Sequence, residues 1–408
     1  MHYIRLLRPP EIERHGGARP GQPVAHSLKI VLTITTDLSD AYLAPEQPVE
    51  LAFIGASHVD KSRPPVPVML APARPQKWHA GIRVLKLDLP LPPQPPITTI
   101  LIRPASRHLA ALATADIYPG QQQDGSASQG LILPVYADIL TAAHDDKRHV
   151  CFRSLRLPNA DGSAATALQI EEELGESMAR HVWDGGLTAV SMLADLCLGN
   201  GPLSASSSGV SMPMLSRVLQ QHQRLNIMEL GCGVGILGVG VARILHAASP
   251  DSNRASTRVL LTDLADARER ARANIERCVH QAPGCHVDFE SLDWDDGKAG
   301  RFGPLVQARP WDLVVLSDCT YNDLLSILVK TLSAIHAHSA QQQQQQQQRD
   351  CDTKVLLFTK PRHANERAVF DMLSADGWEV AEQTVVPLPV LYSSEPQTVE
   401  AYLFARRK

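Results

Sequence analysis

The sequence has no apolar run long enough to cross a membrane. Its longest apolar stretches have the length of strands (RVLLTDL, DLVVLS and KVLLF), whereas a membrane-spanning helix needs about 20 residues. The beginning of the sequence, MHYIRLLRPPEIERHGG, also lacks the apolar core of a secretory signal peptide. We therefore expect a soluble protein of the cytoplasm, with the nucleus as a second compartment, and no membrane partner.

Cysteine is scarce, and its spacing lacks the usual paired patterns. The seven cysteines form no C-x-x-C pair and their number is odd, so neither a disulfide framework nor a zinc site is indicated. The sixteen histidines lack metal-ligand spacing, and we expect no metal. The motifs G-x-S-x-G, H-E-x-x-H and G-K-[ST] are also absent, which argues against serine hydrolases, zinc peptidases and P-loop enzymes.

The charge balance has little excess of either sign. The 408 residues include 39 Lys and Arg and 43 Asp and Glu, which gives a formal net charge of −4. A protein that coats nucleic acid needs a basic field along one face, so nucleic acid is not an expected partner. A hydrophobic fraction of 44% is typical of a folded chain, and the length favours two or three domains.

Proline is concentrated at the beginning of the chain. Of the 30 prolines, 16 lie in the first hundred residues, where they exclude long helices but leave room for short strands. Apolar or alternating segments between them predict strands at 28–38, 48–55, 81–90, 97–103 and 130–136. We therefore expect a small, proline-rich and β-rich N-terminal domain over residues 1–150, with a partly disordered extension as the alternative.

From about residue 165 the pattern changes to short apolar strands that alternate with helical segments. This alternation is typical of a parallel sheet with crossover helices, so we expect an α/β domain over residues 165–408. The segment LQIEEELGESMARHVWDGGLTAVSMLADLCLG is expected to give helical elements around a turn at Gly185 and Gly186. Flexible insertions are expected at 201–222 and 339–352. The second contains eight consecutive glutamines, interpreted as a solvated loop expansion, with self-association as the alternative.

The most informative segment is NIMELGCGVGILGVG, in which an apolar strand leads into alternating glycines and then a helix. The glycines permit a tight turn and a close approach of a ligand; close helix–strand packing alone is the alternative. Residues 233–238 match G-x-G-x-x-G, but Asp263, the acid ending the next strand, lies 30 residues after Gly233, whereas a dinucleotide site expects about 20. Glu229 completes E-x-G-x-G-x-G, which favours S-adenosylmethionine, with Asp263 accepting hydrogen bonds from the ribose hydroxyls.

Further motifs occur in a fixed order along the chain. They are Val182-Trp183-Asp184, Glu229 to Gly235, Thr262-Asp263, Leu292-Asp293-Trp294, Asp318-Cys319-Thr320-Tyr321 and Lys360-Pro361-Arg362. With them the C-terminal part resembles the family 16 methyltransferase domain, one of the seven-β-strand, non-SET enzymes that include many protein-lysine methyltransferases. The whole chain is similar to the longer "rapid response to glucose" type members. The resemblance implies a Rossmann-like, seven-stranded class I methyltransferase domain and S-adenosyl-L-methionine as the cofactor.

The resemblance and the glycine pattern together give the expected cofactor-binding residues. They are Trp183, Glu229, Gly231, Cys232, Gly233, Gly235, Asp263, Trp294 and Ser317. Trp294 follows the third strand and is expected to pack against the adenine, with an ordinary core position as the alternative. Trp183 is expected to close over the cofactor or else to serve as a packing residue. Cys232 and Ser317 stand where the family often has alanine, and both are small enough to leave the site intact.

The strand WDLVVLS ends at Asp318, and ligands bind at the carboxyl ends of strands in an open α/β sheet. A lysine nucleophile must lose a proton with a pKa of about 10.4, and burial beside a sulfonium lowers that value. We expect Asp318 to capture the ammonium and Tyr321 to orient the amine; a helix N-cap and a packing residue are the alternatives. The tetrapeptide lacks the prolines of the N-P-P-Y motif of base-methylating enzymes, which again argues against nucleic acid.

The sequence therefore predicts an S-adenosylmethionine-dependent methyltransferase. It is expected to act as a monomer on a lysine of a protein partner, which the N-terminal domain helps to select. A small-molecule N-methyltransferase of the same fold is one alternative, because the fold does not determine the acceptor. The other is a non-catalytic binding module; the joint presence of the cofactor loop, the ribose acid and D-x-x-Y argues against it.

Overall fold

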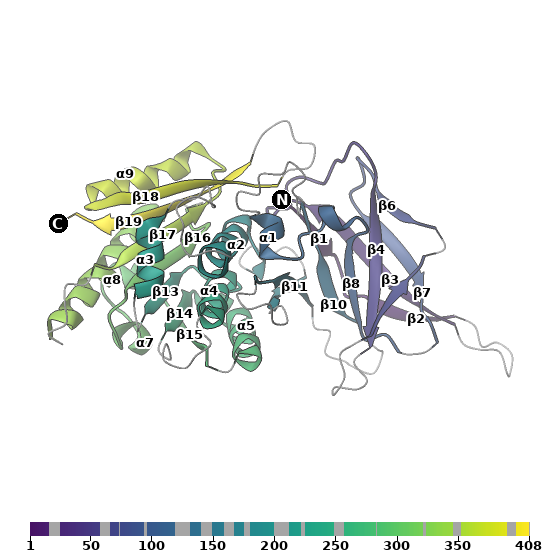
Figure 1. Cartoon of the computed structure of the whole chain (residues 1–408), viewed down its shortest axis with the longest axis horizontal. Coiled ribbons are helices and arrows are strands. Elements are labelled where there is room, and N and C mark those ends of the chain that lie inside the picture. The colour runs from purple at the N-terminus through teal and green to yellow at the C-terminus, as the bar shows by residue number, and fades with distance from the viewer. Residues whose placement is uncertain are drawn as a thin grey trace.

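The chain folds into a β-rich N-terminal part and an α/β C-terminal part, which lie side by side along the long axis of the molecule (Figure 1). The computed structural model describes residues 1–15, 25–57, 66–72, 74–93, 96–118, 131–139, 149–158, 167–174, 180–199, 212–221, 225–248, 257–282, 284–320, 324–345, 352–389 and 397–407. Over these ranges, no helix is both long enough and apolar enough to cross a bilayer.

Two mainly antiparallel sheets form the N-terminal part. The first has the order β2-β3-β1-β9, with β7 also paired to β3, and the second has the order β12-β11-β10-β8-β4-β5, with β6 also paired to β4. Their strands are β1 (His2–Leu6), β2 (Glu11–His15), β3 (Ala25–Thr35), β4 (Val49–Ser57), β5 (Val66–Leu70), β6 (Gln76–Trp78), β7 (Leu85–Pro90), β8 (Thr99–Pro104), β9 (Ile132–Leu133), β10 (Val135–Asp138), β11 (Val150–Arg156) and β12 (Ala167–Glu173). The five strands expected here are present, shifted by a few residues, and the last is divided into β9 and β10.

Strands β11 and β12 carry the N-terminal sheets past residue 150, the boundary expected from the sequence. The expected helical character of LQIEEE is wrong, because this segment is β12. Leu168, Ile170 and Glu172 alternate along the strand, are buried and point to one face, while Glu171 is buried on the other face. Glu172 is buried there against the guanidinium of Arg153 on β11. A glutamate-rich segment can therefore be a strand when an arginine on the paired strand neutralises its buried carboxylate.

The two faces of β1 pack against different parts of the molecule. Ile4 and Leu6 belong to the hydrophobic core between the two N-terminal sheets. Tyr3 lies on the opposite face and belongs to the core that contains the helices of the C-terminal part. The first strand of the chain is therefore shared between the two halves.

A seven-stranded sheet with the order β15-β14-β13-β16-β17-β19-β18 forms the C-terminal part. Its strands are β13 (Asn226–Leu230), β14 (Arg258–Asp263), β15 (His286–Ser291), β16 (Leu313–Ser317), β17 (Lys354–Thr359), β18 (Trp378–Pro387) and β19 (Thr398–Arg406). The strands from β13 to β17 pair in parallel, whereas β19 is antiparallel to both β17 and β18. This is the Rossmann-like, seven-stranded fold that the sequence predicts.

Helices cover both faces of this sheet (Figure 1). The α-helices of the chain are α1 (Thr114–Ile117), α2 (Asp184–Leu198), α3 (Pro213–Gln221), α4 (Ile236–Ala247), α5 (Arg268–Gln281), α6 (Trp294–Gly297), α7 (Pro304–Gln307), α8 (Leu325–Gln345) and α9 (Ala368–Ala375). Apolar residues of α2, α4 and α5 form one core with the strands, and those of α8 and α9 form another. The face with α2, α4 and α5 is the one turned toward the N-terminal sheets.

Both expected insertions contain helix. Residues 213–221 form α3, because the carboxylate of Glu382 accepts hydrogen bonds from the amides of Met214 and Leu215 at its first turn. Helix α8 continues as far as Gln345, so the first five glutamines of the run are helical rather than a loop. Glutamine is a good helix former, and Gln343 is buried against the protein. The remaining glutamines lie outside the described residues.

The expected turn at Gly185 and Gly186 is also wrong, because both residues lie in the first turn of α2. A Cβ atom on Gly185 would lie 2.4 Å from Oδ2 of Asp318, and one on Gly186 would lie 2.8 Å from Cγ2 of Ile236. The glycines therefore let the start of α2 approach the end of β16 and the start of α4.

Candidate active site

A cavity of about 300 Å³ lies at the carboxyl ends of β13, β14, β15 and β16. Eight residues proposed from the sequence line it: Trp183, Gly231, Cys232, Gly233, Asp263, Trp294, Ser317 and Asp318. Glu229 and Gly235 do not line it, and Tyr321 lies outside the described residues. The site thus gathers side chains from four strand ends and from the segment before α2, which are far apart in sequence.

The glycine loop after β13 adopts backbone conformations that other residues rarely adopt. Gly231, Gly233 and Gly235 have φ angles of 67°, 54° and 82°. A Cβ atom on Gly231 would lie 2.6 Å from Sγ of Cys319 and 3.4 Å from the indole of Trp294. The loop therefore presents bare backbone to the cavity, as a ligand that packs against the loop requires.

Glu229 and Gly235 support the loop from behind. Glu229 is buried, and its Oε2 accepts a hydrogen bond of 2.9 Å from the amide of Gly238 in α4. Burial raises the pKa of its carboxyl well above the usual glutamate value. Gly235 is the N-cap of α4, and a Cβ atom there would lie 2.5 Å from Leu261. Glu229 and Gly235 thus hold the loop against α4 and β14, and their role as cofactor contacts stays a prediction.

Asp263 at the end of β14 joins the glycine loop to the segment that follows β14. Its Oδ2 accepts a hydrogen bond from the amide of Gly233 at 2.7 Å, and its Oδ1 accepts one from the amide of Leu264 at 2.7 Å. Burial raises the pKa of this carboxyl. Since a carboxylate has about four acceptor positions, Asp263 retains capacity for two neighbouring hydroxyl donors.

Asp318 is buried at the end of β16 and adopts a left-handed conformation with a φ of 52°. Its Oδ2 accepts a hydrogen bond from the amide of Gly185 at 2.7 Å. Its Oδ1 accepts from Nη1 of Arg362 at 2.8 Å and from the amide of Lys360 at 3.2 Å. Burial raises the pKa of Asp318, although Arg362 opposes the shift. Three donors thus fix the carboxylate, and one acceptor position of Oδ2 remains.

An ion-pair network behind Asp318 joins the two halves of the protein. Asp37, in the loop after β3, accepts hydrogen bonds from Nη2 of Arg362 at 2.6 Å and from Nζ of Lys360 at 3.3 Å. Asp184, at the start of α2, accepts from Nζ of Lys360 at 2.7 Å and from the hydroxyl of Tyr3 at 2.6 Å. Burial disfavours the charge of Arg362, but Asp318 and Asp37 still raise its pKa well above the usual value. Two aspartates, a lysine and an arginine are therefore paired within the protein next to the cavity.

Sequence reasoning assigned no role to this network. Its members were visible only as part of the V-W-D and K-P-R motifs, and no local pattern connects Asp37 to either of them. Arg362 also stacks on Trp183, with its Cζ 5.2 Å from the ring centroid. Further cavity residues that were not proposed are His181, Gly186, Val234, Ile236, Leu264, Leu292, Asp293, Asp295, Cys319 and Leu324. Most of them are neighbours in sequence of a proposed residue. The residues that follow each predicted strand end would therefore have identified them.

Comparisons with known proteins match this chain to one family model and to a relative from yeast. A family model described as "Lysine methyltransferase" matches residues 163–376, slightly more than half of the chain. A UPF0665 family protein of Schizosaccharomyces pombe is 23% identical over 381 residues, which are 93% of this chain and 94% of the relative.

Solved structures with a similar fold include two methyltransferases. TYW2 of M. jannaschii in complex with AdoMet is 10% identical with a TM-score of 0.33, and the match covers 59% of this chain and 83% of that one. Precorrin-6y C5,15-methyltransferase of Geobacter metallireducens is 11% identical with a TM-score of 0.30, and the match covers 50% and 94%.

Proposed function

Since the chain belongs to the lysine methyltransferase family, we propose that it transfers a methyl group from S-adenosyl-L-methionine to a lysine side chain of a protein. The observation that carries the proposal is the cavity at the strand ends, where the glycine loop, Asp263, Trp294 and Asp318 meet. The methyltransferase chemistry follows from the family, whereas the acceptor is our proposal.

The residues of the cavity fit the cofactor. The bare backbone at Gly231 leaves the space that a Cβ atom would fill, and Asp263 has acceptor capacity for the two ribose hydroxyls. Trp294 lies beside Gly231 and offers an aromatic face for the adenine. The cofactor supplies an activated methyl group on a sulfonium, so the protein needs mainly to align a neutral nucleophile and to exclude water.

Asp318 is the acidic side chain that we propose to bind the ammonium group of the acceptor lysine. Its carboxylate is held by Gly185, Lys360 and Arg362, and Oδ2 keeps an acceptor position for an ammonium. The fixed orientation lets Asp318 direct the side chain toward the methyl group, and Tyr321 is proposed to orient the amine once the proton has left. A buried position beside the sulfonium lowers the pKa of the lysine and so favours its neutral form.

The test is methyl transfer from labelled cofactor to proteins of a whole-cell extract. A discrete labelled band with the wild type, and its loss in Asp318→Asn and Tyr321→Phe with unchanged cofactor affinity, supports the proposal. Tyr136→Phe is a matched control, because Tyr136 lies on β10 of the N-terminal part and does not line the cavity. Label confined to the low-mass fraction favours a small-molecule acceptor. Calorimetry without cofactor binding contradicts enzymatic activity altogether.

A further inference from the structure

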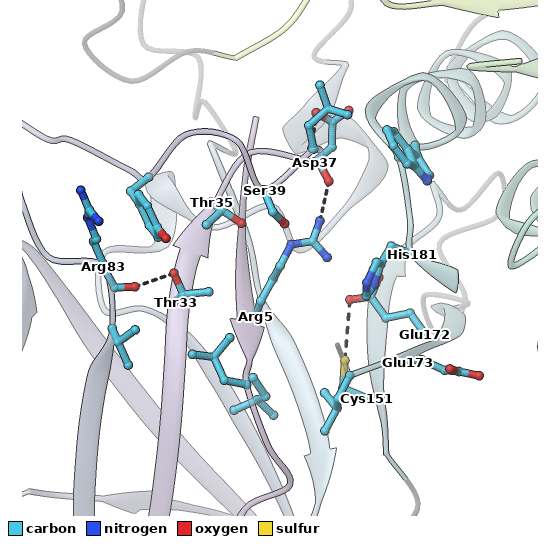
Figure 2. A pocket seen from close by; sticks show the side chains of 17 residues that line it. Arg5, Thr33, Thr35, Asp37, Ser39, Arg83, Cys151, Glu172, Glu173 and His181 are labelled. Carbon is cyan, nitrogen blue, oxygen red and sulfur yellow. Dashed lines mark hydrogen bonds and ion pairs between the residues drawn. The ribbon is translucent and has the colours of Figure 1, made fainter. Parts of the chain in front are cut away.

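A second and larger cavity lies where the N-terminal sheets meet the segment before α2. Its volume is about 570 Å³, and it lies between β1, β3 and the region around His181 (Figure 2). His181 and Trp183 line both this cavity and the cofactor cavity. The two cavities therefore adjoin each other at His181 and Trp183.

Polar side chains line this cavity on one face of the first sheet. Arg5 of β1 is paired in register with Thr33 of β3, and Tyr3 is paired with Thr35. Because side chains alternate along strands, Arg5, Thr33 and Thr35 point away from the core between the sheets. Arg5 and Thr35 are only 8% and 2% exposed. Arg5 and Thr35 thus contribute buried polar groups to the cavity wall.

Several of these groups have no partner within the described protein. Nε and Nη1 of Arg5 and Oγ1 of Thr35 are buried without a hydrogen bond, whereas Nη2 of Arg5 donates to the carbonyl oxygen of Asp37 at 2.9 Å (Figure 2). Buried polar groups are nearly always satisfied, so unsatisfied donors in a cavity indicate a ligand with acceptor atoms.

The charges of the cavity wall favour an anionic group. Its acidic side chains are all paired: Asp37 with Arg362 and Lys360, Glu172 with Arg153, and Glu173 with Arg180 and Arg270. Among the described residues, no ion pair is formed by Arg5 or Arg83, whose guanidiniums lie against the rings of Tyr3 and Tyr42. The cavity therefore has two arginines available for a carboxylate and no unpaired acid to repel it.

The cavity is also bordered by exposed apolar side chains. Leu7, Leu38, Tyr42 and Val84 are 38% to 49% exposed, and all four line it. An exposed group of apolar residues beside buried polar donors is typical of a surface that binds another protein. A small polar metabolite would leave this border uncovered.

We propose that this cavity binds the segment of the acceptor protein that flanks the methylated lysine, and that Arg5 and Arg83 pair with an acidic side chain of that segment. Apolar residues of the same segment pack on the border, and its lysine extends past Trp183 toward Asp318. This inference rests on the proposed transfer to a protein lysine and adds to it the sequence preference of the acceptor.

The test uses peptides with a central lysine in which each flanking position is varied among acidic, neutral and basic residues. With labelled cofactor and the full chain, we expect acidic residues to be preferred over basic ones by about tenfold at one or more positions. Equal transfer to acidic and basic peptides overturns the proposal.

Two variants separate acceptor binding from folding. Thr35→Val keeps the side-chain shape and removes a hydroxyl without a partner, so its thermal stability should be unchanged or higher. Arg83→Ala removes an exposed side chain without an ion pair in the described protein. Both should raise KM for the best peptide several-fold, at unchanged cofactor Kd, and Arg83→Ala should weaken the acidic preference. Arg14→Ala is the matched control, because Arg14 is exposed on β2 outside the cavity lining.

The remaining results separate the assignment of this cavity from the proposed transfer to a protein lysine. If the wild type labels proteins of a cell extract but no peptide, the same variants are compared on the extract. Reduced labelling by Thr35→Val and Arg83→Ala, with cofactor Kd and labelling by Arg14→Ala unchanged, supports the cavity assignment, and equal labelling overturns it. A wild type that binds the cofactor and labels neither peptide nor protein contradicts the proposed function and the inference together.

Discussion

Asp37, from the loop after β3, lies 2.6 Å from Nη2 of Arg362, which follows the strand β17 of the other half of the protein. The same arginine holds Asp318 through its Nη1. The N-terminal part therefore takes part in fixing an acidic side chain of the candidate active site. A catalytic domain without its N-terminal sheets would lack one of the two carboxylates that orient Arg362.

The first prediction concerns this contact. Asp37→Ala should lower stability by about 3 kcal/mol, because it leaves part of a buried charge uncompensated, and it should lower kcat more than it weakens cofactor binding. Urea unfolding and methyl-transfer kinetics measure the two effects. The control is Asp88→Ala, which breaks an exposed ion pair with Lys29 and should change neither. Equal behaviour of the two variants would show that the contact does not position Arg362.

The second prediction distinguishes the backbone of Asp318 from its charge. Asparagine tolerates the left-handed conformation that Asp318 adopts, whereas alanine does not tolerate it as well. Both Asp318→Asn and Asp318→Ala should lose methyl transfer, and both lose the ion pair with Arg362, but the alanine variant should have the lower melting temperature of the two. Similar melting temperatures would mean that the φ angle is not a constraint at this position.

The third prediction concerns the glycine loop. Gly231→Ala introduces a Cβ atom 2.6 Å from Cys319 Sγ at a φ of 67°, so it should weaken cofactor affinity by at least about tenfold, measured by calorimetry. Gly300→Ala is the control, since Gly300 has a φ of 69° and no neighbour within 4 Å of the added atom. A comparable loss of cofactor affinity in both variants would mean that strain at a positive φ causes the loss, and not the atom added in the cavity.

The fourth prediction is a pH dependence. Burial opposes the charge of Glu172, but Arg153, Arg5 and His181 lower its pKa to about 2 from the ordinary glutamate value of 4.5. A carboxyl group with a lowered pKa in the folded protein stabilises the fold fully at a pH above its pKa in the unfolded chain. This stabilisation is lost as the pH falls from 4.5 toward 2. The loss should be about 3 kcal/mol. Urea unfolding at pH 6 and pH 3 should therefore show a smaller difference for Glu172→Gln than for the wild type. Equal differences would contradict the assignment.

The sequence predicted the C-terminal sheet well because its parallel strands are short, continuous apolar runs. β13 and α4 lie where the strand and the helix of NIMELGCGVGILGVG were expected, with the glycines between them. The N-terminal strands β1, β2, β5, β6, β11 and β12 were missed. Charged residues such as Glu172 interrupt the apolar pattern of β12, and Pro67 interrupts that of β5. The helical glutamines were missed because composition alone does not reveal that Gln343 packs against the protein.

Residues of the candidate site could be predicted where they belong to a short sequence motif. Those whose place depends on contacts between distant parts of the sequence were missed. Asp263, Trp294 and Asp318 each end or follow a strand, so their convergence on the strand ends could be anticipated, and Trp183 comes directly before α2. The role of Asp37 could not, because its partners Lys360 and Arg362 are fixed only by the way the two halves pack. The same limit applies to Glu229, whose place behind the loop depends on the close approach of Gly238.

The pairing of Asp37 with Arg362 joins positions that are 325 residues apart. During synthesis the β strands of the first half emerge from the ribosome long before the arginine is made, and the polar sheet face with Arg5 and Thr35 stays uncovered for most of translation. A chain that stalls after the second strand of the methyltransferase sheet exposes both this face and the unpaired edge of that sheet. Unpaired strand edges favour aggregation of nascent chains, and the contact that fixes Asp318 can form only after Arg362, near the end of the polypeptide, has been made.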